Sequence, residues 1–180
     1  MDVAGGNHLA RVRHLREAFS SANEKLVGRL RGAEDAAAEK TDGTGWSAAQ
    51  VGWHVAAVNT RFAALISGDA PNAKPLPEGF EPKPWTEIEA GMPERLEAPG
   101  AVVPPGPVRR QEAVAALESS AVKMARALDT LTAERGGKLG VTNPLVGTIN
   151  LYQVGDWAAG HVERHLRQVT GLLEQSSAAP

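Results

Sequence analysis

Two histidines, His161 and His165, lie four residues apart in the stretch GHVERHL, at 160–166. In a helix this spacing places both imidazoles on one face, about one turn apart. The chain has only five histidines, so the pair is either part of a metal site or two polar residues on a helix surface. A metal site requires that this face points inward and that a third ligand exists elsewhere.

The helical segment around this pair indicates which way the two histidines point. They belong to a stripe with alternating steps of three and four residues, which is the a/d rhythm of a helix packed in a bundle. We therefore expect both imidazoles to point into the bundle, at positions where apolar residues usually lie. The full stripe comprises Leu151, Val154, Ala158, His161, His165, Gln168 and Leu172.

A third histidine, His54, lies in a comparable stripe with Val51, Val58 and Leu65. A single inward histidine is more often a hydrogen-bonded core residue than a ligand, so His54 alone would be a weak signal. Three imidazoles on two helices that face one interior are a stronger one. Burying them without partners would cost roughly 1–3 kcal/mol for each group. One divalent cation would satisfy all three.

The chemistry of such a site follows from its ligands. Three neutral imidazoles leave at least one coordination position for water or substrate, as in catalytic metal sites. Imidazole suits zinc, nickel, copper and iron, so the ligands do not identify the element. The motif is not H-E-x-x-H, because Val162 follows His161, and helical spacing turns Glu163 about 160° away from the histidine face. A zinc protease with Glu163 as base is therefore not expected.

Composition excludes several other classes of function. The 180 residues include 19 Lys and Arg and 21 Asp and Glu, a net charge of −2, and no basic stripe that would bind nucleic acid. No run of about 18 apolar residues could span a membrane, and the first residues lack the order of a signal peptide. The absence of cysteine excludes disulfides, thiolate metal ligands and a cysteine nucleophile. We expect a cytoplasmic protein.

Four segments have helical periodicity, and none has the strict alternation of a strand. The first is expected over about 7–39. The second begins with a capping box made by Ser47 and Gln50 and ends at Gly68. In the first helix, the residues that recur at steps of three and four and are predicted to face the bundle are Leu9, Val12, Arg16, Phe19, Ala22, Leu26 and Leu30.

The third helix is expected to begin near Pro107 and to end at Gly136 and Gly137, and the fourth to run from about Asn150 to Gln175. Together the four segments predict an all-α fold, a four-helix bundle in one domain over 1–180. The ends, 1–6 and 176–180, are expected to be disordered.

A proline-rich connection at 69–107 is expected to link the second and third helices as one long crossover. Ten of the twelve prolines lie between Pro71 and Pro107, which excludes one continuous helix there. A short helix is expected around WTEIEAGM. Because the segment contains apolar anchors, we expect an ordered cover and not a loose tether. These anchors are Phe80, Trp85, Ile88 and Met92.

Two stretches of the sequence resemble the DinB-like (YfiT-like) family of metal-dependent enzymes. GWSAAQVGWHVAAVNTRF, at 45–62, is similar to the start of that family's second helix. NPLVGTINLYQVGDWAAGHVERHLRQV, at 143–169, is similar to its closing segment, where an asparagine- or histidine-proline turn and a glycine precede a helix ending in H-x-x-R-H-x-x-Q. The helix order and the long connection extend the likeness over most of the chain.

The resemblance implies a four-helix bundle that binds a divalent metal through His54, His161 and His165. Characterised relatives include transferases and isomerases that use mycothiol, bacillithiol or glutathione, in which the metal activates the thiol of the cosubstrate. The implied partners are therefore a small-molecule thiol and an electrophilic substrate. Zinc or nickel is expected as the metal, with iron as the next candidate. A homodimer is also expected. One subgroup has a glutamate where this chain has His161, so the chain is nearer the three-histidine branch. A non-catalytic metal- or ligand-binding stress protein is the alternative.

Four further polar groups have weaker claims to a role. Gln168 lies one turn beyond His165 and could bond a ligand, or it could be a packed amide. Arg61 and Arg164 could hold an anionic substrate, or they could form ion pairs of little energy. The histidines of the charged N-terminal stretch, His8 and His14, are expected to be solvated.

Overall fold

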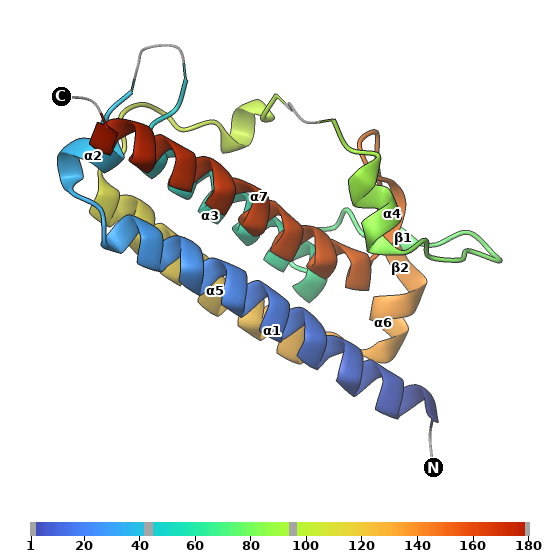
Figure 1. Cartoon of the computed structure of the whole chain (residues 1–180). Helices are drawn as coiled ribbons and strands as arrows, with labels where there is room; N and C mark the ends of the chain where they lie inside the picture. The colour runs from blue at the N-terminus through green and yellow to red at the C-terminus, as the bar shows by residue number, and fades with distance from the viewer. Residues whose placement is uncertain (1–2, 42–44, 94–96, 179–180) are drawn as a thin grey trace.

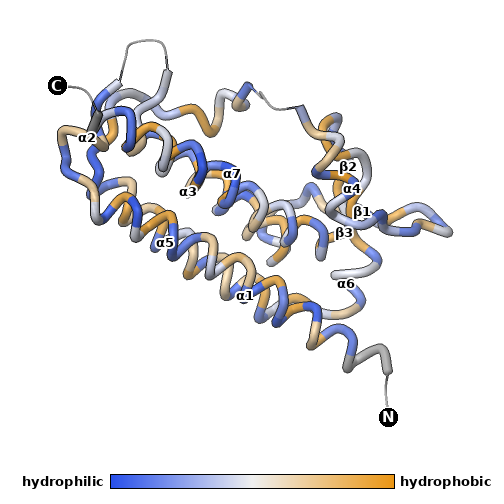
Figure 2. Tube along the Cα trace, viewed as in Figure 1, coloured by the Kyte–Doolittle hydropathy of each residue, from blue (hydrophilic) through white to orange (hydrophobic). Residues whose placement is uncertain are grey.

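Four long helices form a bundle in the computed structural model, which describes residues 3–41, 45–93 and 97–178 (Figure 1). The predicted helical bundle is confirmed. Along each long helix, apolar residues alternate with polar ones, as expected for helices that bury one face (Figure 2). The four helices are α1 (Val3–Arg31), α3 (Ala48–Ser67), α5 (Arg110–Thr130) and α7 (Leu151–Ala178).

Ion pairs fix the relative direction of α1 and α7. Arg11 pairs with Asp156 and Arg29 with Glu174, and the two pairs have the same sequence separation of 145 residues. A constant separation means that the helices run parallel. In Figure 1, α3 and α5 run together in the opposite direction, so the segment that joins them returns the chain along the length of the bundle.

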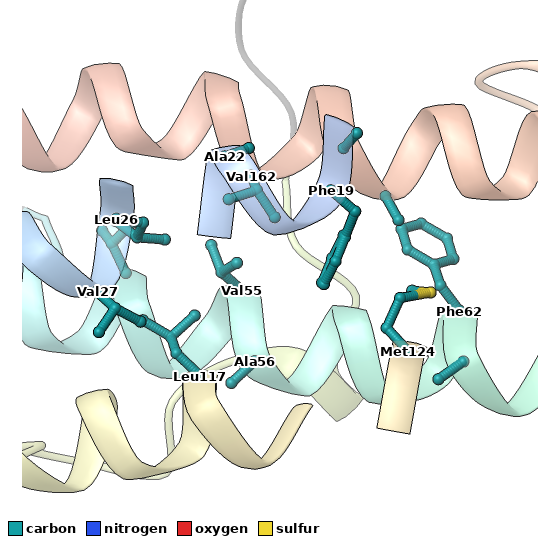
Figure 3. Packing of buried hydrophobic residues seen from close by; sticks show 14 of the residues in the cluster. Phe19, Ala22, Leu26, Val27, Val55, Ala56, Phe62, Leu117, Met124 and Val162 are labelled. Atoms are coloured by element: carbon teal, nitrogen blue, oxygen red, sulfur yellow. The ribbon is translucent and has the colours of Figure 1, made fainter. Parts of the chain in front are cut away.

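The core lies between the four long helices, each of which contributes large apolar side chains (Figure 3). Gly52 allows α3 to pack closely there, because a Cβ at this position would lie 2.7 Å from a methyl carbon of Leu30. Representative members of the cluster are Phe19 and Leu26 of α1, Val55 and Phe62 of α3, Leu117 and Met124 of α5, and Val162 of α7.

The first predicted helix is in fact two helices, because α1 ends at Arg31 and a short α2 (Asp35–Glu39) follows. The chain turns after Gly32, whose N–H still donates to a carbonyl of α1, and glycine has low helix propensity. The predicted stripe is also shifted at its start. Leu9 is 70% exposed and Arg16 is exposed, whereas Leu15 is buried.

The ends of α3 are as predicted. Ser47 accepts from the backbone N–H of Gln50, and the Gln50 side chain accepts from the N–H of Ser47, which completes the capping box. At the other end, Gly68 has φ +93 and caps the helix in the left-handed conformation.

The predicted end of the third helix at Gly136 and Gly137 is wrong. The helix α5 ends at Thr130, and both glycines lie in a separate short helix, α6 (Ala133–Lys138). Gly136 is needed for packing, because a Cβ at this position would lie 2.3 Å from the ring of Tyr152. A glycine required for close packing has the same sequence signature as a helix terminator, which explains the error.

A small antiparallel sheet, which the sequence did not predict, joins α6 to α7. Its strands, in order, are β1 (Lys74–Pro75), β2 (Leu139–Asn143) and β3 (Gly147–Asn150). The strand β3 leads directly into α7, where Asn150 and Gln153 cap each other's backbone N–H groups with their side-chain oxygens. The sheet thus sets where the histidine-bearing helix begins.

The segment between α3 and α5 contains β1, the short helix α4 (Trp85–Ala90) and one 3-10 turn, η1 (Gly100–Val102). The helix α4 confirms the short helix expected around WTEIEAGM. Of the expected anchors, Trp85, Ile88 and Met92 pack against the core, whereas Phe80 lines a surface cavity of about 360 Å³ between this segment and the β2–β3 turn.

The chain ends, 1–6 and 176–180, are only partly described by the structure. Residues 3–6 belong to α1 and residues 176–178 to α7, while 1–2 and 179–180 lie outside the described residues. Within the described ranges, none of the helices combines the length and the apolar character that crossing a membrane would require.

Candidate metal centre

The three predicted histidines meet between α3 and α7. His54 of α3 faces His161 and His165 of α7. The ring centroid of His54 lies 5.3 Å from that of His161 and 5.0 Å from that of His165. The ring centroids of His161 and His165 are 4.4 Å apart. One ring nitrogen from each residue lies within 4.8 Å of the other two. The geometry can therefore bring three nitrogen ligands to one point.

The histidines lie at the margin of the buried face of α7 and not at its centre. Val162 is wholly buried, whereas His161 and His165 are half-buried and Gln168 is exposed. The predicted stripe assumed 3.5 residues per turn, but a straight helix has 3.6 and so drifts by about 20° per heptad. Over the length of α7 this drift carries the stripe out of the core, to the surface at Gln168.

His54 is oriented by the backbone of the connecting segment. It is 5% exposed, and its Nδ1 lies 2.9 Å from the carbonyl oxygen of Val102. A carbonyl can only accept, so Nδ1 carries the proton and donates, and Nε2 keeps the lone pair that a metal needs. Burial lowers the pKa of His54, and the bond to Val102 opposes that shift.

His165 is oriented in the same way by a side chain of its own helix. Its Nδ1 lies 2.8 Å from Oε1 of Gln168, which again leaves Nε2 as the available ligand atom. Burial lowers the pKa of His165 to about 4, with smaller contributions from the charges of His54 and Arg164, while the bond to Gln168 acts in the opposite direction. Gln168 is predicted to bond a ligand or a metal-bound water, and in the structure its side chain bonds the ring of His165.

His161 is half-buried as a residue, but its Nδ1 atom is fully buried. Burial holds its pKa well below the ordinary value, and the charges of His165, His54 and Arg164 lower it further. Its Nδ1 is buried without a hydrogen-bond partner among the described residues. Such a nitrogen is costly to bury, and a cation coordinated at this nitrogen would offset that cost.

These residues fit a divalent metal. Burial lowers the pKa of all three imidazoles, which favours the neutral form that coordinates a cation. Two nitrogens bound to one zinc at about 2.0–2.1 Å lie at most about 4.2 Å apart, so modest ring rotations from the 4.8 Å limit would complete the site. Among the described residues, the group that meets here contains histidines alone and no carboxylate.

The two arginines with a predicted role both contact the connecting segment. Nη1 of Arg164 donates to the carbonyl of Pro93 at 3.1 Å, and Nη2 of Arg61 lies 3.5 Å from the carbonyl oxygen of Ala101. Glu163 is exposed, as its predicted orientation requires.

Of the two N-terminal histidines, His14 is exposed as expected, but His8 is not simply solvated. It is half-buried, and its Nδ1 forms a 2.7 Å hydrogen bond with the hydroxyl of Tyr152. The partner lies 144 residues away in the chain. No local pattern around His8 could have indicated this contact.

Two contributors to the centre were not predicted as site residues. The carbonyl of Val102 holds His54, and the Trp46 ring lies 5.0 Å from the His54 ring. Trp46 directly precedes the Ser47 cap, so its proximity to the first turns of α3 could have been inferred. A backbone carbonyl has no residue-type signature, so the role of Val102 could not.

One protein-family model matches the sequence over most of its length. The model of the DinB superfamily matches residues 18–169, which is most of the chain and includes all three histidines. Among curated proteins, none matches the sequence significantly. The match over 18–169, together with the helical bundle and its three converging histidines, shows that the chain belongs to the DinB superfamily.

Proposed function

We propose that the protein binds a divalent metal ion through His54, His161 and His165 and uses it to activate a low-molecular-weight thiol for transfer to an electrophile. The observation that carries the proposal is the convergence of three imidazoles from two helices, and burial lowers the pKa of each. The family likeness adds the expectation of thiol chemistry.

The residues of the chain have distinct tasks in this proposal. Val102 and Gln168 fix the protonated nitrogen of His54 and His165, so that each presents Nε2 as a ligand. His161 contributes the ring that is costliest to bury without a partner. When bound, a divalent cation would supply Lewis acidity that lowers the pKa of a thiol at the open position.

The source of the thiol follows from the composition. The chain has no cysteine, so the nucleophilic sulfur has to arrive with a cosubstrate of the mycothiol, bacillithiol or glutathione type. The reaction would then be an S-transfer or an isomerisation. Zinc and nickel are the first metals to test and iron the next, because all three accept imidazole ligands.

Metal binding is tested by elemental analysis and by calorimetric titration of chelator-treated protein. We expect one divalent ion per chain in the wild type and its loss in His165→Ala. His14→Ala is the matched control, because it removes an exposed imidazole outside the centre. Absence of metal in the folded wild type, or an equal loss of metal in His14→Ala and His165→Ala, would refute the proposed centre.

Thiol chemistry is tested by incubating metal-loaded protein with each class of thiol and a panel of electrophiles such as epoxides, maleyl compounds and aryl halides. We expect thioether formation or isomerisation that stops on chelation and returns with metal. Turnover that persists in the metal-free protein would show that the centre is not the catalytic group.

A second candidate is a non-catalytic metal- or ligand-binding protein that acts in a stress response by association. It is favoured by one observation, the lack of any carboxylate in the histidine group within the described residues. Tight metal retention without turnover for any thiol would favour this function. The expected homodimer is tested separately by light scattering of the wild-type protein.

A further inference from the structure

Residues 99–107, PGAVVPPGP, form a strap that lies along the first turns of α3. Two hydrogen bonds of about 2.9 Å attach it to the first turns of α3, and a longer one of 3.5 Å joins Nη2 of Arg61 to the carbonyl oxygen of Ala101 further along the helix. Nε2 of Gln50 donates to the carbonyl of Gly106 at 2.9 Å, and Nδ1 of His54 donates to the carbonyl of Val102 at 2.9 Å. Gln50 and His54 are four residues apart, as are the two carbonyls, so the strap crosses successive turns of α3 on one face.

The strap is restricted before it docks. Four of its nine residues are prolines, whose fixed φ lowers the entropy lost on ordering. The N–H of Val102 donates to the carbonyl of Pro99 and that of Val103 to the carbonyl of Gly100, and the side chain of Val102 is buried. Because the segment is stiff, the position of Gly106 determines the position of Val102, four residues away.

Gln50 therefore has two roles. Its Oε1 accepts from the backbone N–H of Ser47 in the capping box, while its Nε2 holds the strap. Gln153 does the same at the start of α7, where Oε1 accepts from the N–H of Asn150 and Nε2 donates to the carbonyl of Lys83. Each helix that carries a histidine ligand is thus capped by a glutamine that also holds the connecting segment. Among the described residues, the hydrogen bond that joins a candidate ligand to the connecting segment is the one from His54 to Val102, in the strap held by Gln50.

We propose that Gln50 is a positioning residue of the metal centre. By seating the strap at Gly106, it places the Val102 carbonyl where it holds the His54 ring with Nε2 directed at the other two histidines. The inference rests on one part of the proposed function, the binding of a metal ion at this centre, and not on thiol chemistry. Without this seat, His54 loses its fixed tautomer and orientation, and metal affinity should fall by about 10–100-fold, as for other partners that orient metal ligands.

The sharpest variant is Gln50→Glu. A glutamate keeps the oxygen that caps Ser47, and it is a preferred residue at that position of a capping box, but it has no N–H for Gly106. Gln50→Ala is the second variant, since it removes the donor without placing a charge beside the carbonyl. Gln153→Glu is the matched control, because it breaks the equivalent bond to Lys83 and leaves the strap intact.

Metal dissociation constants are measured by competition with a chromophoric chelator, together with the thermal midpoint of each metal-free variant. We expect Kd to rise about 10–100-fold in Gln50→Glu and Gln50→Ala, and to change less than about threefold in Gln153→Glu. Equal affinity in Gln50→Glu and wild type would overturn the inference, as would an equal loss in Gln153→Glu.

A second arm uses the metal-free protein, so that it is independent of the proposed function. Nitrogen-15 NMR of the imidazoles reports which ring nitrogen of His54 is protonated. We expect Nδ1–H in the wild type and in Gln153→Glu, and a mixture of tautomers in both Gln50 variants. Unchanged His54 signals would overturn the positioning role, whereas failure of the wild type to bind metal would overturn only the proposed function.

Discussion

The three candidate ligands differ in what the Nδ1 atom of each ring contacts. His54 and His165 each have Nδ1 engaged by an oxygen, whereas Nδ1 of His161 is buried without a described partner. Groups that hold the far nitrogen fix the tautomer and orientation of a ligand. The contribution of Gln168 to the centre can therefore be measured by its removal.

We expect Gln168→Ala to weaken metal binding by about 10–100-fold, because His165 would lose the acceptor that keeps its proton on Nδ1. Gln168→Glu should retain much of the affinity, since a carboxylate accepts the same bond. The control is Gln175→Ala, which removes an exposed glutamine further along α7. Isothermal titration of chelator-treated proteins measures the difference, and equal losses in Gln168→Ala and Gln175→Ala would contradict it.

The stability of the metal-free protein should depend on pH through the same residues. In the unfolded chain histidine titrates near pH 6.5, whereas in the folded protein the pKa of His165 is about 4. Between these values the unfolded state binds more protons, so the free energy of unfolding falls as the pH drops from 6.5 toward 4. A histidine that stays neutral when folded contributes a slope of up to about 1.4 kcal/mol per pH unit.

Urea denaturation at several pH values between 4 and 7, on wild type and His165→Gln, checks this expectation. The variant should lose stability less steeply below pH 6.5. The difference between the two proteins isolates His165 from other groups such as Asp156, whose pKa burial raises. Parallel curves for the two proteins would be inconsistent with a depressed pKa at His165.

At the scale of elements, the close approach of α4 to α7 depends on one glycine. Gly160 directly precedes the candidate ligand His161, and a Cβ at Gly160 would lie 3.2 Å from Oε1 of Glu89 and 3.3 Å from Nε1 of Trp85. Gly171, on the same helix, has nothing within 4 Å of a Cβ. The two positions therefore form a matched pair.

We expect Gly160→Leu to displace α4 and to cost about 1–3 kcal/mol, as overpacking does. Gly171→Leu should instead stabilise the protein by about 0.5–1 kcal/mol, because leucine has the higher helix propensity. Urea denaturation gives both values, and a change in tryptophan emission, to which Trp85 contributes 6.4 Å from Trp157, would accompany displacement of α4. A stabilising Gly160→Leu would show that α4 adapts without cost.

The long helices were predictable, and so was the meeting of the histidines. Periodicity and the Ser47 capping box indicated α3, and the four-residue spacing of His161 and His165 indicated one face of α7. The strands β2 and β3 were not predictable, because they have five and four residues and are defined by their pairing. The capping role of Gln50 was visible in the sequence, but its bond to Gly106 joins residues 56 apart and was not.

For the molecule as a whole, metal binding should appear as added stability. A ligand that binds only the folded state at 100 times its Kd adds about 2.7 kcal/mol. For a chain of this length that corresponds to a rise in Tm of about 5–11 °C. Thermal scans with zinc or nickel should show such a rise, which is reversed by chelator and absent in His54→Ala. An equal rise in His54→Ala would place the metal elsewhere.

The parallel course of α1 and α7 has a mechanical consequence. Their outer ends, near Val3 and Ala178, lie at opposite ends of the long axis (Figure 1). Force applied to both ends in an optical trap would therefore slide the two helices past each other. The Arg11–Asp156 and Arg29–Glu174 pairs would then bear load together, whereas a helix pair pulled from one end separates turn by turn. The bundle should resist pulling as a sheared interface and give way in a single step.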